Sequence, residues 1–250
     1  MRIAATAGST AAALVAVGAG ALIGCGHPAA VHDAPGPPGA PSDASVADAS
    51  PADTPADTPA DTPAGLPDLQ FVADAMRGTV EVIQQFFPDD DCAVQEGCVG
   101  APGWRTLVVF DTVTTNLGTG DLRIGIPPEA GVSDGVFQWS PCHMHHHFAD
   151  YASYELVDEA GNVVTARKQA FCLEDERQLV LGAPSHGYTC ANQGISYGYA
   201  DAYTRGVACQ WIDATDLHGN YTLRVTVNPK GTIVETDTTN NELTLPVPPL

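Results

Sequence analysis

The strongest chemical signal in this chain is a run of histidines. The segment reads Trp139-Ser-Pro-Cys142-His143-Met144-His145-His146-His147. On a β-strand alternate side chains share a face, at steps of about 6.6 Å, so His143, His145 and His147 would lie on one side. His146 would point to the opposite face. Because strands twist, three such imidazoles can converge on one ion, and we predict that these three histidines form a metal site.

Copper is the metal we expect there. Neutral imidazole nitrogens suit Cu(II), which also heads the affinity series for divalent first-row ions. Zinc bound by three histidines with one open coordination position is the alternative, and it would favour a hydrolase. Chelation of stray metal by an irregular loop is the remaining explanation, and the strand-like context of the run argues against it.

The chain is strongly acidic. Of its 250 residues 30 are acidic and 10 basic, which gives a formal net charge of −20, and the only lysines are Lys168 and Lys230. Six acidic residues and one basic residue lie before residue 66, so residues 66–250 alone carry −15. Binding a phosphate backbone needs clustered Lys and Arg, so we expect no nucleic acid partner. The charge could steer cationic substrates such as amines, or serve solubility or adaptation to salt.

The first 24 residues predict an export signal. They carry one charge, Arg2, followed by an apolar run too short and too rich in small residues for a transmembrane span. The run ends Leu22-Ile23-Gly24-Cys25, which looks like a bacterial lipobox. We therefore predict a signal peptide over residues 1–24, lipidation at Cys25, and a lipid anchor in the bacterial outer membrane or at the cell surface. An ordinary signal peptide with a coincidental cysteine is the alternative.

Residues 25–65 predict a disordered tether between the lipid anchor and a folded domain. The segment is rich in Pro, Ala, Asp and Thr, and the tetrapeptide Pro-Ala-Asp-Thr occurs three times between residues 51 and 62. From residue 27 to 65 it holds no aromatic residue that could form a core, and its prolines favour extended polyproline II. The folded part is therefore residues 66–250, which is the usual size of one domain.

Strand patterns dominate the folded part. We expect strands over residues 106–115, 151–157, 163–171, 221–227, 233–235 and 242–247, with a hairpin turn at residues 158–162. Only residues 71–87 support an amphipathic helix, and the stretch at 80–82 within them is ambiguous. Short strands between Gly, Asn and Pro turns predict an all-β, β-sandwich-like domain with long loops and few short helices.

Six cysteines follow Cys25. An even number in an exported chain indicates disulfides, although six cysteines allow 15 connectivities. A zinc site is the alternative, but no Cys-x-x-Cys motif occurs. The six are Cys92, Cys98, Cys142, Cys172, Cys190 and Cys209.

Several motifs in order give the chain a resemblance to a known family. Trp-x-x-Cys-His-x-His-x-His at residues 139–147 is one, and Lys168-Gln-Ala-Phe-Cys-Leu-Glu-Asp175 is another. The set also includes the segments at residues 201–216, 219–229 and 235–241, and the spacing of Cys92 and Cys98. Over residues 66–246 the chain resembles the lysyl oxidases, copper amine oxidases that carry a lysine tyrosylquinone cofactor.

The resemblance implies roles for individual residues. His143, His145 and His147 would bind copper, and Lys168 and Tyr203 would be the two precursors of the quinone, four residues before Cys172 and six before Cys209. Tyr188, Tyr197 and Tyr199 are nearby competitors for the tyrosine role, less favoured by position.

The chain also departs from the family pattern. Two family cysteines are absent, which leaves Cys172 and Cys209 to pair with each other, so the resemblance implies the disulfides Cys92–Cys98, Cys142–Cys190 and Cys172–Cys209. A histidine proposed as the general base has no counterpart here. We predict Asp150 as the base, with His186 as a second candidate.

The function that follows is that of a protein-lysine 6-oxidase-like enzyme. It would convert primary amines, either peptidyl lysine or small amines, to aldehydes with dioxygen as the oxidant, releasing hydrogen peroxide and ammonia. Its partners would be a primary amine or a lysine-containing protein, dioxygen, and the membrane through the lipid anchor. A non-catalytic surface β-sandwich that binds copper and a three-histidine zinc hydrolase are the competing readings.

Overall fold

The computed structural model describes residues 65–166 and 171–250. The predicted signal peptide, the lipidation site at Cys25 and nearly all of the tether lie outside these residues, and so does Lys168. Among the described residues, no helix has the length and apolar character needed to cross a membrane.

The described residues form an almost entirely β structure with two single-turn helices. The prediction of an all-β fold with few short helices and several disulfides is confirmed. In chain order the elements are β1 (Leu69–Phe71), α1 (Ala73–Met76), β2 (Glu81–Phe87), α2 (Cys92–Gln95), β3 (Gly103–Val109), β4 (Thr112–Asn116), β5 (Leu122–Gly125), β6 (Phe137–Ser140), β7 (His145–Phe148), β8 (Ala152–Asp158), β9 (Val163–Thr165), β10 (Arg177–Gln178), β11 (Gln193–Ile195), β12 (Tyr199–Tyr203), β13 (Trp211–Asp213), β14 (Tyr221–Val227) and β15 (Glu242–Pro246).

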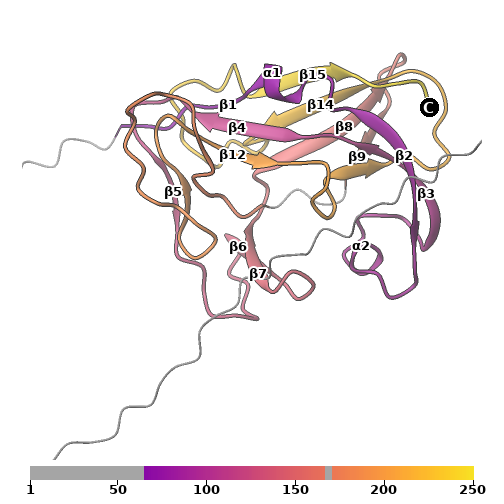
Figure 1. Cartoon of the computed structure of the whole chain (residues 1–250), viewed down its shortest axis with the longest axis horizontal. Coiled ribbons are helices and arrows are strands. Elements are labelled where there is room, and N and C mark those ends of the chain that lie inside the picture. The colour runs from indigo at the N-terminus through magenta and orange to yellow at the C-terminus, as the bar shows by residue number, and fades with distance from the viewer. Residues whose placement is uncertain (1–64, 167–170) are drawn as a thin grey trace, which may run out of the picture. The chain divides into compact units, whose positions relative to one another are not determined.

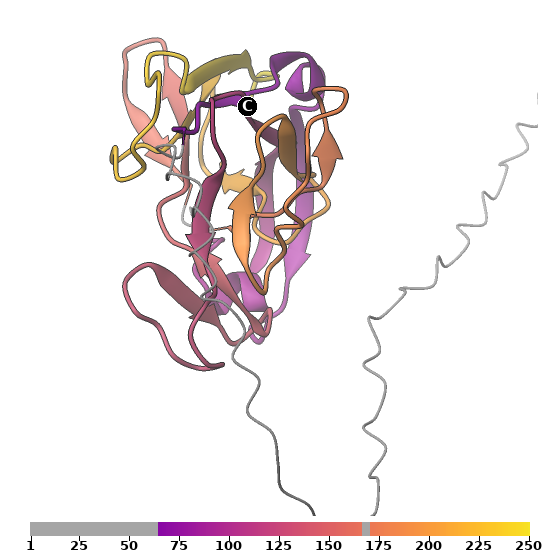
Figure 2. The same cartoon turned by 90° about the vertical axis from the view of Figure 1, so that its left-hand side faces the viewer.

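These strands pair antiparallel in five sheets. Two sheets have four strands, in the orders β1-β4-β12-β10 and β15-β14-β8-β9, and one has three, in the order β13-β3-β2. The remaining two are the pairs β11-β5 and β6-β7. In both views the β6-β7 pair lies at one end of the domain, away from β14 and β15 (Figure 1, Figure 2).

One large core joins the two four-stranded sheets. Leu69 of β1 packs in the same buried cluster as Leu156 of β8 and Leu223 of β14, and all three side chains are fully buried. Strand β14 alternates buried and partly exposed residues, as its sequence predicts, because one face of the sheet covers this core. A smaller second core gathers around Phe87, Leu107 and Trp211.

Several predicted strands are confirmed. The hairpin at residues 151–171 forms β8 and β9, although β9 is shorter than expected and residues 167–170 are not described. Strands β14 and β15 lie where expected and pair with each other. The predicted strand 106–115 is instead two strands, because the chain bends at the buried Phe110 and passes from the three-stranded sheet into a four-stranded one.

The predicted helix over residues 71–87 is wrong. Only α1 is helical, and Gly78 follows it with a φ of +77°, a left-handed conformation that ends the helix at little cost for glycine. Residues 81–87 form β2 and pair with β3 along their whole length. Tertiary pairing therefore overrides the weak helical periodicity.

The predicted strand over residues 233–235 is also wrong. This segment is a loop that side-chain hydrogen bonds hold in place. The Glu235 carboxylate accepts hydrogen bonds from the Leu69 amide at 2.7 Å, from Asn228 at 2.6 Å and from Asn241 at 2.8 Å. The Asn228 side chain in turn donates to the Ile233 carbonyl at 2.8 Å and accepts from the Ile233 amide at 3.1 Å, so side chains satisfy backbone groups that a strand ladder would otherwise satisfy.

The disulfide connectivity differs from the one that the resemblance implied. The three predicted pairs, Cys92–Cys98, Cys142–Cys190 and Cys172–Cys209, are all wrong. The observed pairs are Cys92–Cys142, Cys98–Cys209 and Cys172–Cys190.

Local structure separates Cys92 from Cys98. The Asp91 carboxylate accepts a hydrogen bond from the Ala93 amide at 2.7 Å and so starts α2 at Cys92. Cys98 lies in the second core, where its carbonyl accepts a hydrogen bond from the Trp211 indole at 3.2 Å. Cys209 is buried in the same core, so Cys98 pairs across 111 residues rather than with its neighbour in sequence.

Candidate functional site

The β6-β7 hairpin carries the three predicted metal ligands. His145 and His147 lie on one face of β7, in register with Ser140 and Gln138 of β6. His143 belongs to the turn between the strands, where the next residue, Met144, has a φ of +58°. The three histidines therefore do not share one strand, as the alternation had predicted, and the turn brings the first of them to the other two.

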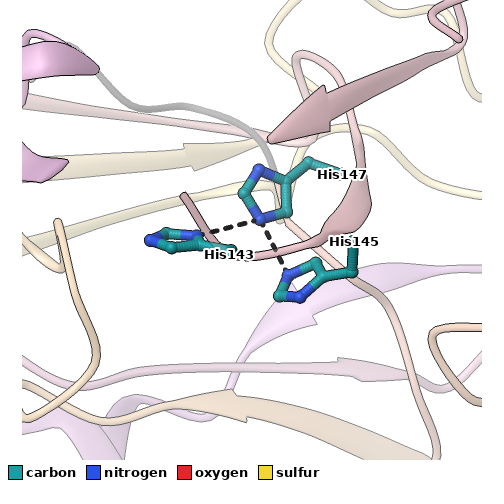
Figure 3. Close-up of side chains that lie close together, drawn as sticks. All are labelled: His143, His145 and His147. Carbon is teal, nitrogen blue, oxygen red and sulfur yellow. Dashed lines mark hydrogen bonds between the residues drawn. The ribbon is translucent and has the colours of Figure 1, made fainter. Parts of the chain in front are cut away.

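The three imidazoles meet at one point. The Nε2 atom of His147 lies 2.9 Å from Nε2 of His145 and 3.5 Å from Nδ1 of His143 (Figure 3). Nitrogen ligands held about 2.0 Å from one ion are themselves about 3 Å apart, so this set fits a single metal. Its donor chemistry, three imidazole nitrogens, suits Cu(II) or Zn(II).

His146 points to the opposite face of β7, as predicted. Its Nε2 atom lies 2.8 Å from the Val132 carbonyl oxygen, and its ring packs edge-on against Trp139 at 4.9 Å between ring centres. It therefore anchors the hairpin and lies apart from the cluster of three.

Helix α2 supports the cluster from outside. Glu96, at the end of α2, places its Oε2 atom 3.7 Å from Nε2 of His143, and its other oxygen accepts a hydrogen bond from the Ser140 hydroxyl at 2.5 Å. At 3.7 Å this contact is electrostatic and longer than a hydrogen bond, and the negative charge on that side of the ring favours a proton on Nε2. The disulfide Cys92–Cys142 ties the same helix to the turn that carries His143.

A cavity of about 220 Å³ connects the histidines with Tyr203. Tyr203, the last residue of β12, donates a hydrogen bond from its hydroxyl to the Cys172 carbonyl and packs against Phe171 at 4.7 Å between ring centres. Burial, together with the nearby Asp201 carboxylate, raises the pKa of Tyr203 well above its ordinary value. The phenol is therefore neutral at physiological pH.

Acidic groups surround this cavity. Glu174 and Glu176 line it, and none of its described lining residues is Lys or Arg. Burial, and then the charge of Glu176, raise the pKa of Glu174. Asp201, two residues before Tyr203 on β12, is 2% exposed, and its Oδ2 atom has no hydrogen-bond partner. Burial and the charges of Glu176 and Glu174 raise its pKa well above the ordinary range.

The competing tyrosines lie elsewhere. Tyr197 lines a separate cavity of about 810 Å³, and the Tyr188 hydroxyl donates a hydrogen bond to Asp121 at 3.2 Å. Tyr199 begins β12 but is not among the residues that line the histidine cavity. Among the described tyrosines, only Tyr203 lines the cavity that the three histidines share.

Neither predicted base lies in the histidine cavity. The Asp150 carboxylate pairs with Lys230 at 2.8 Å, on a turn where Asp150 has a φ of +58°. His186 lies beside the larger cavity and pairs through Nδ1 with Asp121 at 2.7 Å. Lys168, predicted to be the other quinone precursor, is outside the described residues, although Phe171, shortly after it in sequence, lines the histidine cavity.

Sequence reasoning missed the acidic groups of this site. Glu174 lies within the quoted motif at residues 168–175, so its position was visible but its place in the cavity was not. Asp201 likewise begins the motif segment at residues 201–216, but its burial beside the site was not visible. Glu96 gave no signal of its own, because only the fold brings α2 to the β6-β7 turn.

Comparison with known proteins identifies the family. A family model described as lysyl oxidase matches residues 71–247, which is most of the chain. This chain belongs to the lysyl oxidase family. The resemblance drawn from the motifs is thereby confirmed.

Three curated relatives illustrate this membership. Lysyl oxidase homolog 1 of Homo sapiens is 33% identical over 190 residues, which cover 71% of this chain and 32% of that protein. Lysyl oxidase homolog 3 of Homo sapiens is 38% identical over 167 residues, 61% of this chain and 21% of that protein. Protein-lysine 6-oxidase of Gallus gallus is 32% identical over 190 residues, 71% of this chain and 44% of that protein. The chain therefore spans less than half the length of these relatives.

Proposed function

We propose that this lysyl oxidase family member is a copper-dependent amine oxidase. It would convert primary amines, either peptidyl lysine or small amines, to aldehydes, consuming dioxygen and water and releasing ammonia and hydrogen peroxide. The observation that carries the proposal is the single cavity lined by three converging histidines and by Tyr203. The protein-lysine 6-oxidase among its relatives supports the same reaction class.

Copper would be held by Nδ1 of His143 and by Nε2 of His145 and His147. These are the nitrogens that face one another, while the far nitrogen of His143 faces Glu96. The Glu96 carboxylate would hold a proton on that far nitrogen, which leaves Nδ1 free to bind the metal. Copper bound by these histidines would supply the redox chemistry for dioxygen in the cavity that Tyr203 also lines.

The organic cofactor would be a lysine tyrosylquinone built from Lys168 and Tyr203. When present, this group supplies a carbonyl that reacts with primary amines and a store for the two electrons that the substrate loses. The contacts of Tyr203 support this assignment, because the Cys172 carbonyl and the Phe171 ring hold the side chain at the cavity wall. Such fixed placement would keep the ring within reach of the copper.

The acidic lining favours an amine as substrate. A primary amine enters as an ammonium ion at neutral pH, and Glu174 and Glu176 would attract that charge where no described lining residue is cationic. The cavity of about 220 Å³ has room for the end of an alkyl-ammonium chain such as a lysine side chain.

We also propose that the domain works outside the cytoplasm. Its three disulfides need an oxidising compartment to form and persist. The predicted signal peptide and lipidation at Cys25 would deliver it to the bacterial outer membrane or cell surface, with residues 25–65 as the tether to a catalytic domain over residues 66–250.

Tyr203→Phe tests this function. The variant should bind copper normally and lose amine oxidation, because a ring without its hydroxyl gives no precursor for the quinone. Oxygen uptake with a primary amine and the copper content measured together report both properties. Tyr199→Phe, on the same strand but outside the cavity, is the matched control and should stay active.

Two results would contradict the proposal. Amine oxidation by the Tyr203→Phe variant would remove the quinone assignment. A parent protein that binds copper yet oxidises no amine would instead support a non-catalytic copper module, and hydrolysis with bound zinc would support a hydrolase.

A further inference from the structure

We propose that Glu174 is the general base that removes the proton from the substrate carbon next to the nitrogen. The inference rests on the amine oxidase function proposed above and assigns a residue to its proton-transfer step. The site needs such a base, and the two residues that the sequence suggested, Asp150 and His186, do not line the histidine cavity.

Glu174 has the required position. It lines the cavity together with the three histidines and Tyr203, so a substrate that reaches the Tyr203 ring occupies the same cavity as the Glu174 carboxylate. The disulfide Cys172–Cys190 fixes the loop that carries it, since a carboxylate oxygen of Glu174 lies within 4.8 Å of both sulfur atoms. A base held in this way is pre-positioned rather than recruited from solvent.

Its chemical environment also suits a base. The side chain is half-buried, and it shares the cavity lining with Glu176, Tyr203 and the three histidines, while the buried Asp201 lies close enough for the Glu174 charge to raise its pKa. Burial and the neighbouring Glu176 carboxylate raise the pKa of Glu174, and a carboxylate with a raised pKa accepts a proton more readily than an exposed one.

Glu176 is a weaker choice for the same role. One of its carboxylate oxygens already accepts a hydrogen bond from the Ala202 amide at 3.0 Å, and the residue is exposed. Glu174 also accepts a backbone hydrogen bond, from Cys190 in its own disulfide-linked loop, but its side chain is less accessible to water than that of Glu176. In the proposed step Glu174 would take the proton from the substrate carbon next to the nitrogen as that carbon–hydrogen bond breaks. The quinone, when present, would supply the acceptor for the electron pair of the broken bond.

The test compares Glu174→Gln and Glu174→Asp with the parent protein after loading with copper in air. Copper content and the quinone content, titrated with phenylhydrazine, should match the parent in both variants. The kcat/KM for benzylamine should fall by about 10²- to 10⁴-fold in Glu174→Gln, the usual range for a lost general base. Glu174→Asp should recover part of that loss because it restores a carboxylate.

Two further readouts separate a base from a structural residue. With benzylamine deuterated at the reacting carbon, the isotope effect on kcat should be larger in Glu174→Gln than in the parent, because proton removal then limits the rate. Reduction of the quinone by the amine in a single turnover without dioxygen, followed at pH 7, should slow in Glu174→Gln and recover in part in Glu174→Asp.

Two variants serve as references. Glu159→Gln, at an exposed hairpin turn, makes the same change in charge and should behave as the parent. Asp150→Asn distinguishes the base predicted from sequence from the one proposed here. Three outcomes would overturn the assignment. The first is a kcat/KM and an isotope effect in Glu174→Gln equal to those of the parent, and the second is a loss of activity in that variant that missing copper or quinone explains. The third is inactivation by Asp150→Asn but not by Glu174→Gln. Failure of the amine oxidase function would look different, because the parent itself would then hold no phenylhydrazine-reactive quinone.

Discussion

The three histidines of the proposed metal site gain their geometry from two unlike sources. His145 and His147 share a face of β7, as strand alternation requires, while His143 enters from a turn whose next residue is left-handed. On a straight strand His143 would lie farther from His147. The turn folds His143 back, so that its Nδ1 atom lies 3.5 Å from Nε2 of His147. The cluster is thus a property of the hairpin and of the histidine spacing together.

Replacing His145 with Ala should remove copper from the site. Two remaining imidazoles hold the metal far less firmly than three. Loss of a residue that only hydrogen-bonds to a metal ligand lowers metal affinity by up to about 100-fold, so loss of the ligand itself should lower the copper affinity by more than that. Metal titration followed by electron paramagnetic resonance measures this directly. His218→Ala, an exposed histidine outside the cavity, is the control. Unchanged copper binding by the His145 variant would contradict the assignment.

At this scale the sequence led to the histidine cluster and to Tyr203, which the fold places in one cavity, while their roles in binding metal and forming a quinone stay predictions. Both belong to local motifs, so a short stretch of chain carries the information. The general base was not predictable in the same way, because nothing in the segment around Asp150 shows that Lys230, 80 residues later, pairs with its carboxylate. Glu174 becomes a candidate only when β12 and the β6-β7 turn lie beside its loop.

At the scale of elements, an ion pair joins the strands that flank the second core. Arg105 of β3 binds Asp213 of β13 at 2.6 Å, and both side chains are mostly buried. The same carboxylate accepts hydrogen bonds from the Gly100 amide at 2.8 Å and from Thr215. Burial alone would raise the pKa of Asp213, but these donors outweigh it and hold the pKa below its ordinary value.

Asp213→Asn should destabilise the domain by about 3 kcal/mol at pH 7, because it leaves Arg105 without its charged partner. A carboxyl whose pKa is lower in the folded protein stabilises it above the ordinary pKa and loses that effect as the pH falls. The difference in unfolding free energy between parent and variant should therefore shrink below about pH 4. Urea unfolding at several pH values measures it, with Glu159→Gln as control. A difference that stays constant down to pH 2 would contradict this account.

Element types were predictable where local pattern and tertiary pairing agree. The strict alternation of residues 221–227 produced β14, and the Gly and Asn turn at 158–162 produced the β8-β9 hairpin. Residues 71–87 failed because β2 obtains its stability from pairing with β3, which no periodicity within the segment reveals. The segment at 233–235 failed because Glu235 bonds with residues distant in sequence.

At the scale of the whole domain, the disulfides bring the site together. Cys98–Cys209 closes 111 residues and fixes the segment after Tyr203 to the second core, while Cys172–Cys190 fixes the loop of Glu174. Connectivity of this kind depends on which cysteines the fold buries together, so neither spacing nor the family resemblance could supply it. The family itself was predictable because its motifs recur in order along the chain.

The central claim is that Lys168 and Tyr203 become one quinone next to copper, and peptide mass spectrometry of the full chain tests it most directly. After copper loading in air, digestion should yield one cross-linked product that joins the peptide of Lys168 to the peptide of Tyr203 and carries the added quinone oxygen. The same protein kept free of copper should give both peptides unmodified. Copper-loaded protein in which both peptides stay separate and unoxidised would contradict the account.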